Sequence, residues 1–169
     1  MNIQKSENNI KLGVEYKLLF GDTPLTLDKG FMSEGGRLPS MTGLVAPDLS
    51  NAEVNNDIRK TIFTVPSLDT PVCEWQIKHL SNSLSDNVDN NMLFFVVSVD
   101  TPFAQARFIK DNNINPKIRF LSDYSEHSFM EQSGLRIIEL NLFARAIIEC
   151  DDNNIVQRVT IPRDITHVP

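Results

Sequence analysis

The chain has 169 residues, of which 41% are hydrophobic and 22% charged, so we expect one compact domain over residues 1–169. Its net charge of −6 argues against a nucleic-acid-binding surface, which needs an excess of Lys and Arg. Two cysteines exclude a disulfide framework, no apolar run is long enough to cross a membrane, and the first residues lack a secretory signal. We therefore expect a cytoplasmic protein with reduced cysteines that binds neither nucleic acid nor membrane.

The first residues predict a flexible segment followed by a β-hairpin. Residues 1–12 are polar and rich in Asn, and we expect them to be flexible. The apolar runs 16–20 and 24–27 flank a Gly-Asp turn signal, which predicts the hairpin. A Gly-rich loop follows over 30–36, and the short apolar run 44–46 ends in a Pro-Asp turn.

The middle of the chain alternates apolar runs of strand length with helix-like segments. Strands are predicted at residues 61–65, 92–99 and 118–121, and helices are predicted to begin at Cys73, Pro102 and Glu126. The run 92–99 is almost continuously apolar, as in a parallel strand buried on both faces. Asp100 or Thr101 can cap the second helix. Its inward face is predicted to carry Phe103, Ala104 and Phe108.

The last third of the chain predicts a short helix and a second hairpin. The helix over 126–132 has Gly134 in the C′ position that follows a helix end. The apolar runs 144–149 and 155–159 flank a turn of Asp and Asn residues over 151–154. Strands and helices that alternate and then give way to a hairpin predict an α/β fold with a mixed sheet.

Cys73 is the residue whose position says most about function. It follows the strand over 61–65 and lies in the first turn of a helix, where backbone N–H groups are unpaired and favour a thiolate, the nucleophilic form. Thr70 can fold its hydroxyl toward the sulfur, while Pro66 and Pro71 stiffen the turn on both sides. The alternative is that Cys73 is a small buried hydrophobic residue.

Arg145 interrupts an otherwise apolar strand over 143–148. A guanidinium on a half-buried strand needs an anion or several acceptors, and a thiolate would be such an anion. The alternative places Arg145 on the solvent face or beside a carboxylate. Trp75 likewise has two interpretations, as the rim of a site or dimer contact and as a packed core residue. The three histidines match no metal-ligand spacing, so we expect no metal site.

Five segments carry further information because of their order along the chain. They are residues 44–50 (LVAPDLS), 66–73 (PSLDTPVC), 98–108 (SVDTPFAQARF), 121–123 (LSD) and 142–146 (LFARA). Together they resemble the thiol peroxidase subfamily of peroxiredoxins, and the resemblance extends over roughly residues 12–165. The resemblance implies a thioredoxin-like α/β fold of the peroxiredoxin type, with an added N-terminal β-hairpin.

The same resemblance implies a reaction and a set of residues that perform it. Cys73 would be the peroxidatic cysteine, with Pro66, Thr70 and Arg145 around it. Its thiolate would attack a peroxide oxygen while Thr70, Arg145 and backbone N–H groups stabilise the departing oxygen. The products are a sulfenic acid and water or an alcohol, and no cofactor is needed. The implied partners are hydrogen peroxide or an organic hydroperoxide, a thiol reductant such as thioredoxin or glutathione, and a second copy in a homodimer.

The sequence departs from the subfamily in two places. Ile109 stands where the subfamily carries its resolving cysteine, so we do not expect the usual intramolecular disulfide. Cys150 lies five residues beyond Arg145, on the opposite face of a strand and about 16 Å along it, too far to bond to Cys73. The family also continues past the segment equivalent to 161–169 into a C-terminal helix, whose absence here would leave one sheet face less covered.

Two functional hypotheses follow from these observations. The first is a thiol peroxidase that acts through Cys73 alone and is regenerated by an external thiol. The second is a degenerate peroxiredoxin that binds a partner according to the redox state of Cys73, with little turnover. The missing resolving cysteine and the missing helix motivate the second hypothesis, and the rate of peroxide turnover distinguishes the two.

Overall fold

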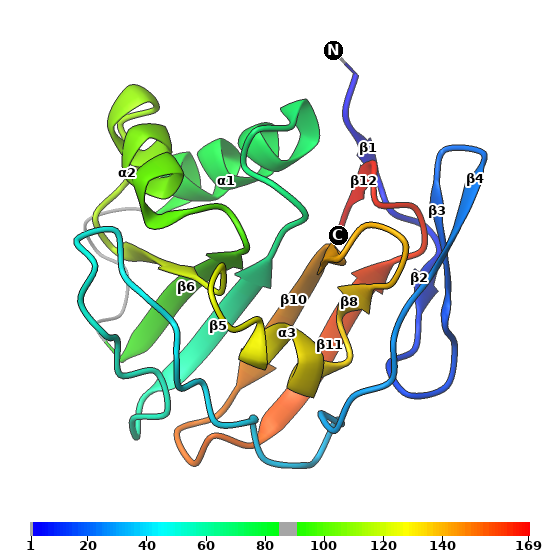
Figure 1. Ribbon diagram of the computed structural model, residues 1–169, viewed down its shortest axis with the longest axis horizontal. Helices are drawn as coiled ribbons and strands as arrows, with labels where there is room; N and C mark the ends of the chain where they lie inside the picture. Colours follow the sequence, from blue (N-terminus) through cyan, green and yellow to red (C-terminus); the bar gives the residue numbers. More distant parts are fainter. Residues whose placement is uncertain (1, 85–90) are drawn as a thin grey trace.

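The computed structural model describes residues 2–84 and 91–169. A mixed sheet of six strands forms its centre, in the order β2-β11-β10-β5-β6-β7 (Figure 1). These strands are β2 (Asn9–Ile10), β5 (Arg59–Thr64), β6 (Met92–Ser98), β7 (Ile118–Ser122), β10 (Ala146–Cys150) and β11 (Val156–Pro162). β5, β6 and β7 run parallel to one another, whereas β10 is antiparallel to both β5 and β11, and β2 is antiparallel to β11.

Three small strand pairs lie outside the central sheet. They are β1 (Gln4–Lys5) with β12 (His167–Val168), β3 (Lys17–Phe20) with β4 (Thr23–Thr26), and β8 (Arg136–Ile137) with β9 (Leu142–Phe143). The predicted first hairpin is the pair β3–β4, and the predicted second hairpin is β10–β11. Both predictions are confirmed, as is the parallel orientation of β6, which pairs with β5 and β7.

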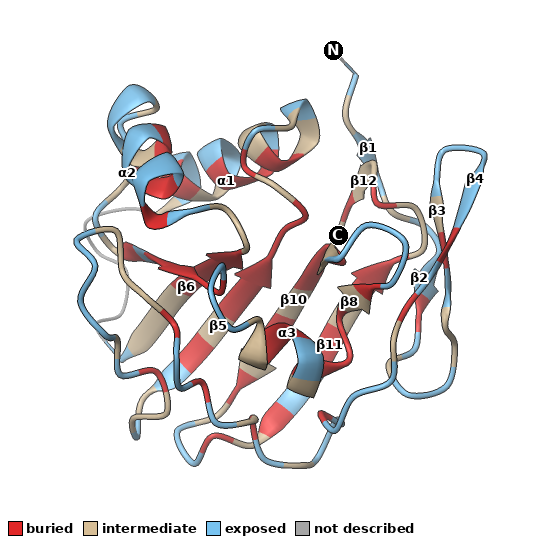
Figure 2. Cartoon of the chain, viewed as in Figure 1, coloured by how far each residue is buried: buried red, intermediate tan, exposed pale blue. Residues whose placement is uncertain are grey.

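Helices lie on both faces of the central sheet. α1 (Pro71–Ser83) and α2 (Pro102–Asp111) lie over β5 and β6, and α3 (Ser128–Ser133) packs on the opposite face (Figure 1). Neighbouring residues of a strand face the two sides alternately, so Phe63 packs with the first pair of helices while Ile62 packs on the side of α3. Two cores result, and β5 and β10 are buried along most of their length (Figure 2).

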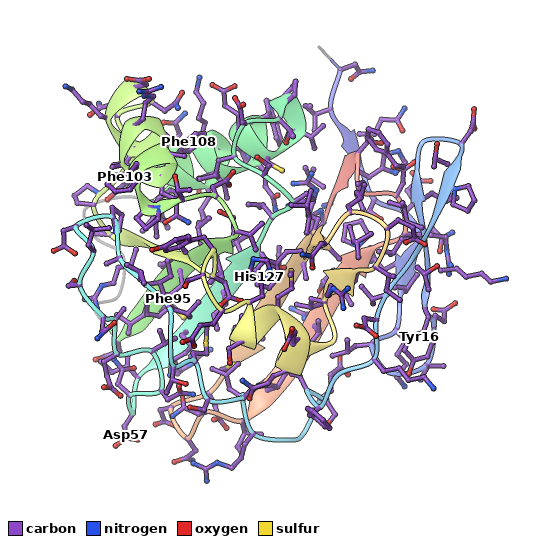
Figure 3. The ribbon with its side chains drawn as sticks, viewed as in Figure 1. Tyr16, Asp57, Phe95, Phe103, Phe108 and His127 are labelled. Atoms are coloured by element: carbon purple, nitrogen blue, oxygen red, sulfur yellow. The ribbon has the colours of Figure 1, made fainter. Side chains whose placement is uncertain are left out.

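The buried face of α2 differs from the prediction. Phe103 is 69% exposed and Ala104 is exposed as well (Figure 3 labels Phe103 and Phe108). The buried residues of α2 are Pro102, Gln105 and Phe108. Gln105 is buried because its Nε2 donates hydrogen bonds to Ser98 Oγ and to the carbonyl of Leu121. A prediction based on apolar residues misses a polar residue on the inward face, so the predicted face is rotated from the observed one.

The first residues also differ from the flexible segment predicted for 1–12. β1 pairs in parallel with β12, and β2 adds to the edge of the central sheet beside β11. Ile10 is 3% exposed and packs in the core on the α3 side. One apolar residue within a polar stretch gives no periodic pattern, so the sequence alone did not indicate that this segment is anchored.

The C-terminal residues turn from β11 into β12, which contacts α1. A cleft of about 320 Å³ remains beside them, and the apolar side chains of Phe63, Leu80 and Ile147 contribute to its wall. Phe63 and Ile147 belong to the core on the side of the sheet that α1 and α2 cover. None of the helices described is both long and apolar enough to cross a membrane.

Candidate active site

Cys73 lies at the point where β5 passes into α1. The chain leaves β5 at Thr64 and reaches α1 through a loop over 65–70 in which Pro66 is buried. The helix begins at Pro71, two residues before the predicted start, because proline is favoured in the first helical position. Cys73 is therefore the third helical residue, and it is 0% exposed.

Thr70 occupies the N-cap position of α1 without capping it. Its backbone is extended, and its hydroxyl donates to the carbonyl of Ser67 at 2.8 Å instead of binding the helix. The first-turn N–H groups, which have no intrahelical partner, are thus left without a side-chain cap. An uncapped helix start favours negative charge, and Cys73 lies in this turn. The Thr70 oxygen, having donated its proton, still has lone pairs that can accept a hydrogen bond.

Arg145 lies one residue before β10 and is 2% exposed. Its Nη1 donates to Gln76 Oε1 at 2.8 Å, while its Nε and Nη2 donate to the carbonyl of Ile165 at 3.1 and 2.8 Å. Gln76 is three residues after Cys73 on α1, so the two side chains lie on one face of the helix. The guanidinium is thereby held beside the helix that carries Cys73.

The surroundings of Arg145 fit neither a solvent-facing nor a carboxylate-paired arginine. Within residues 2–84 and 91–169 no carboxylate forms an ion pair with it, and both of its acceptors are neutral. A buried charge is costly unless an anion compensates it. A thiolate on Cys73, or the oxygen of a bound peroxide, would supply that anion.

Ile109 and Cys150 lie on opposite sides of the sheet. Ile109, on α2, packs against the same core as Cys73. Cys150 belongs to the other core, as the strand spacing predicted, and both cysteines are free. Burial raises the pKa of the Cys150 thiol to about 11, and the neighbouring Lys60 offsets only part of this rise.

Trp75 lies on the exposed side of α1. It is 40% exposed and stacks on His79 with ring centroids 4.8 Å apart. The interpretation of Trp75 as a packed core residue is therefore wrong. A separate cleft of about 630 Å³ lies between the loop that contains Ser67 and helix α2, beside the start of α1. Ser67, Leu68 and Asp69 of the loop and Glu74 of α1 contribute to its wall.

Sequence reasoning missed the two groups that hold Arg145. Gln76 could have been found as a polar residue on the buried face of α1, at a helical spacing from Cys73. The carbonyl of Ile165 carries no sequence signal, because every residue has one. It reaches Arg145 because of the path of the chain after β11, where the Ile165 N–H donates to the carbonyl of Leu19 in β3.

Comparisons with known proteins find chains of similar sequence and similar fold. A family model described as Redoxin matches residues 33–169. A thiol peroxidase from Vibrio cholerae is 32% identical over 156 residues, which cover 89% of this chain and 92% of the relative. The crystal structure of a peroxiredoxin-like protein from Aquifex aeolicus superposes with a TM-score of 0.84 at 33% identity, covering 92% of this chain and 91% of that one. A thiol peroxidase structure from Chromobacterium violaceum has a TM-score of 0.80 at 24% identity, covering 91% and 90%, and shows the shared fold. The predicted thioredoxin-like α/β fold of the peroxiredoxin type is confirmed.

Proposed function

This chain belongs to the Redoxin family and, within it, to the thiol peroxidases, and we propose that it reduces peroxides through Cys73 alone. It is a thiol-dependent peroxidase, as its relatives are, with a peroxide as one substrate and a thiol as the other. The observation that carries the assignment to Cys73 is the buried guanidinium of Arg145, which has no carboxylate partner among the described residues and lies beside the same helix.

The geometry supports a simple displacement. The Cys73 thiolate attacks the nearer peroxide oxygen, the O–O bond breaks, and the other oxygen leaves as an alkoxide or hydroxide that takes up a proton. The Thr70 oxygen accepts a hydrogen bond from the incoming peroxide, while Arg145 and the uncapped N–H groups of α1 stabilise the departing oxygen. Pro66 stiffens the loop that leads to the helix. Cys73 is left as a sulfenic acid.

Regeneration of Cys73 requires a thiol from outside the chain. Ile109 has no sulfur, and Cys150 lies in the other core, so neither can condense with the sulfenic acid in the folded chain. One external thiol forms a mixed disulfide with Cys73 and releases water. A second thiol then attacks the reductant sulfur of that disulfide, which frees the Cys73 thiolate and joins the two reductant sulfurs in a disulfide. Because Cys73 is 0% exposed, a bulky thiol reaches it only when the first turn of α1 moves. Glutathione and thioredoxin are the reductants to test first.

The variant Ile109→Cys tests the one-cysteine mechanism. Wild-type protein given one equivalent of hydrogen peroxide should gain one oxygen atom on Cys73, and a sulfenic-acid trap should label it. Ile109→Cys should instead lose two hydrogen atoms and form a disulfide between Cys73 and the introduced cysteine. A wild-type protein that forms an intramolecular disulfide would contradict the one-cysteine mechanism. A wild-type Cys73 that gains neither oxygen nor label would contradict the peroxidase assignment.

Steady-state turnover distinguishes the peroxidase from the redox-responsive binding protein. With a thiol supplied, the peroxidase consumes peroxide over many cycles, and Cys73→Ser does not. The binding protein would oxidise once and then stop. We further infer a cytoplasmic homodimer, supported by the two free cysteines and by the exposed aromatic side chain of Trp75 on the helix that carries Cys73. Sedimentation equilibrium would test the dimer, and cell fractionation would test the location.

A further inference from the structure

Asp100, directly after β6 and Val99, directs its carboxylate to the loop that precedes Cys73. Its Oδ1 accepts a hydrogen bond from Ser67 Oγ, and its Oδ2 accepts one from the backbone N–H of Leu68, both at 2.8 Å. β5 and β6 are parallel, so their carboxyl ends meet at one edge of the sheet and bring these residues together. Both carboxylate oxygens are therefore used to hold this loop.

Asp100 is itself held by the ends of two neighbouring strands. Its N–H donates to Ser98 Oγ at 3.3 Å, and its carbonyl accepts a short hydrogen bond from Ser122 Oγ. Ser98 and Ser122 are both 0% exposed. Of the two residues that could cap α2, Thr101 does so, because its side chain accepts from the N–H of Ala104 at 3.2 Å. The Asp100 carboxylate is thus free to bind the loop from a fixed position.

The hydrogen bonds continue from Asp100 to the N-cap of the catalytic helix. Ser67 Oγ, which donates to Asp100, also accepts from the N–H of Asp69 at 3.1 Å. The carbonyl of Ser67 accepts the Thr70 hydroxyl proton at 2.8 Å. Ser67 is therefore bonded to Asp100 on one side and to Thr70 on the other. The rotamer of Thr70, three residues before Cys73, depends on this chain of contacts.

We propose that Asp100 is a positioning residue for the peroxide reaction: through Ser67 it fixes Thr70 and the first turn of α1 around Cys73. The inference rests on the proposed function of Cys73. Among the described residues the Asp100 carboxylate bonds to Ser67 and Leu68 and not to Cys73, so it acts through the loop. Its negative charge does not favour a nearby thiolate, so removing that charge alone would not slow the reaction. Any loss of peroxide reactivity in Asp100→Asn therefore comes from a changed position of Thr70 and the first turn of α1.

The test compares two reactions of the same sulfur in Asp100→Asn. The second-order rate of Cys73 oxidation by hydrogen peroxide should fall about tenfold or more, because Thr70 and the helix start lose their fixed geometry. The rate of alkylation of Cys73 by iodoacetamide, which needs no Thr70, should stay the same or rise as the loop loosens. Ser67→Ala should change both rates in the same directions, and it carries the test if Asp100→Asn does not fold. The double variant should show no further loss beyond the larger single effect, because both changes break one chain of contacts.

A matched control is Asp123→Asn. Asp123 is a 0% exposed carboxylate directly after the neighbouring strand β7, and it accepts from the N–H of Met130 in α3 rather than from the Cys73 loop. This variant should lower the melting temperature while its peroxide rate stays within about twofold of wild type. Three results would overturn the proposal: an Asp100→Asn peroxide rate equal to that of wild type, equal losses in oxidation and alkylation, or additive effects of Asp100→Asn and Ser67→Ala. If wild type oxidises no faster than Cys73→Ser, the proposed function fails and the role of Asp100 fails with it.

Discussion

The two cysteines of this chain have the same burial and opposite surroundings. Cys73 and Cys150 are 0% and 4% exposed, and each packs in a hydrophobic core, one on either side of the sheet. Cys73 lies in the uncapped first turn of α1, the helix whose Gln76 accepts a hydrogen bond from the guanidinium of Arg145. Cys150 lies within strand β10, where burial disfavours its thiolate more than Lys60 favours it. We therefore expect the surroundings of each cysteine, rather than its burial or a nearby cation alone, to decide whether it reacts.

What separates the two sites is which donors remain available. The Lys60 ammonium is already bonded to the Asn154 side chain and to the carbonyl of Asn56. The N–H groups of a strand between two partners are used in the sheet, whereas those of a helix start are not. We expect reactivity to follow the donors that still lack an acceptor, and the start of α1 has no side-chain cap.

The largest expected difference between the two sites is the change in the rate of peroxide reduction when each cysteine is replaced. Cys73→Ser should lower the rate of peroxide reduction at least about a thousandfold, because a serine hydroxyl is neither ionised nor an equivalent nucleophile at neutral pH. Cys150→Ala should keep the rate within about twofold, since its side of the sheet does not contribute to the reaction. Steady-state peroxide consumption with a thiol supplied measures both. A large loss of this rate in Cys150→Ala would contradict the expected difference between the two cysteines.

The next largest effect concerns the charge beside Cys73. Arg145→Met should lower the rate of Cys73 oxidation by about a hundredfold, because the departing oxygen loses a preorganised cationic donor. Stopped-flow measurement with hydrogen peroxide would give the rate. Gln76→Ala is the matched test of orientation, with a smaller loss in the same direction, since Arg145 keeps its two bonds to Ile165. An Arg145→Met protein that oxidises as fast as wild type would remove the guanidinium from the mechanism.

A smaller effect is expected at Thr70. Thr70→Val should slow oxidation by about tenfold, because the peroxide loses a hydrogen-bond acceptor and Ser67 loses its donor. Thr70→Ser keeps the hydroxyl and should recover most of the rate. The same stopped-flow assay compares the two variants. Equal rates for Val and Ser would show that the hydroxyl has no role.

The smallest effect is on stability at alkaline pH, and it belongs to Cys150. The folded thiol has a pKa of about 11 against an ordinary value of 9.0, so the unfolded chain loses this proton first as pH rises. The contribution of Cys150 is complete below pH 9 and is lost between about 9 and 11. Wild type should therefore lose stability more steeply than Cys150→Ala over this range, measured by urea unfolding. Subtraction of the two curves removes residues that titrate alike in both, and parallel curves would contradict the buried-thiol account.

The sequence predicted the features that depend on neighbours in the chain. The strand, the turn and the helix around Cys73 follow from local pattern, and the opposite face of Cys150 follows from strand periodicity. The contacts that hold Arg145 come from residues far apart in sequence and include a backbone carbonyl, so no pattern revealed them. The choice between Asp100 and Thr101 as the cap of α2 was open for the same reason, since the loop 32 residues earlier decides it.

The measurement that tests the central claim most directly is a map of oxidation on both cysteines. Reduced wild-type protein is treated with one equivalent of hydrogen peroxide, trapped, digested and weighed peptide by peptide. We expect one added oxygen or trap adduct on the Cys73 peptide, an unmodified Cys150 peptide, and no peptide that joins the two. Oxygen on Cys150 in place of Cys73, or a disulfide between them, would contradict the account.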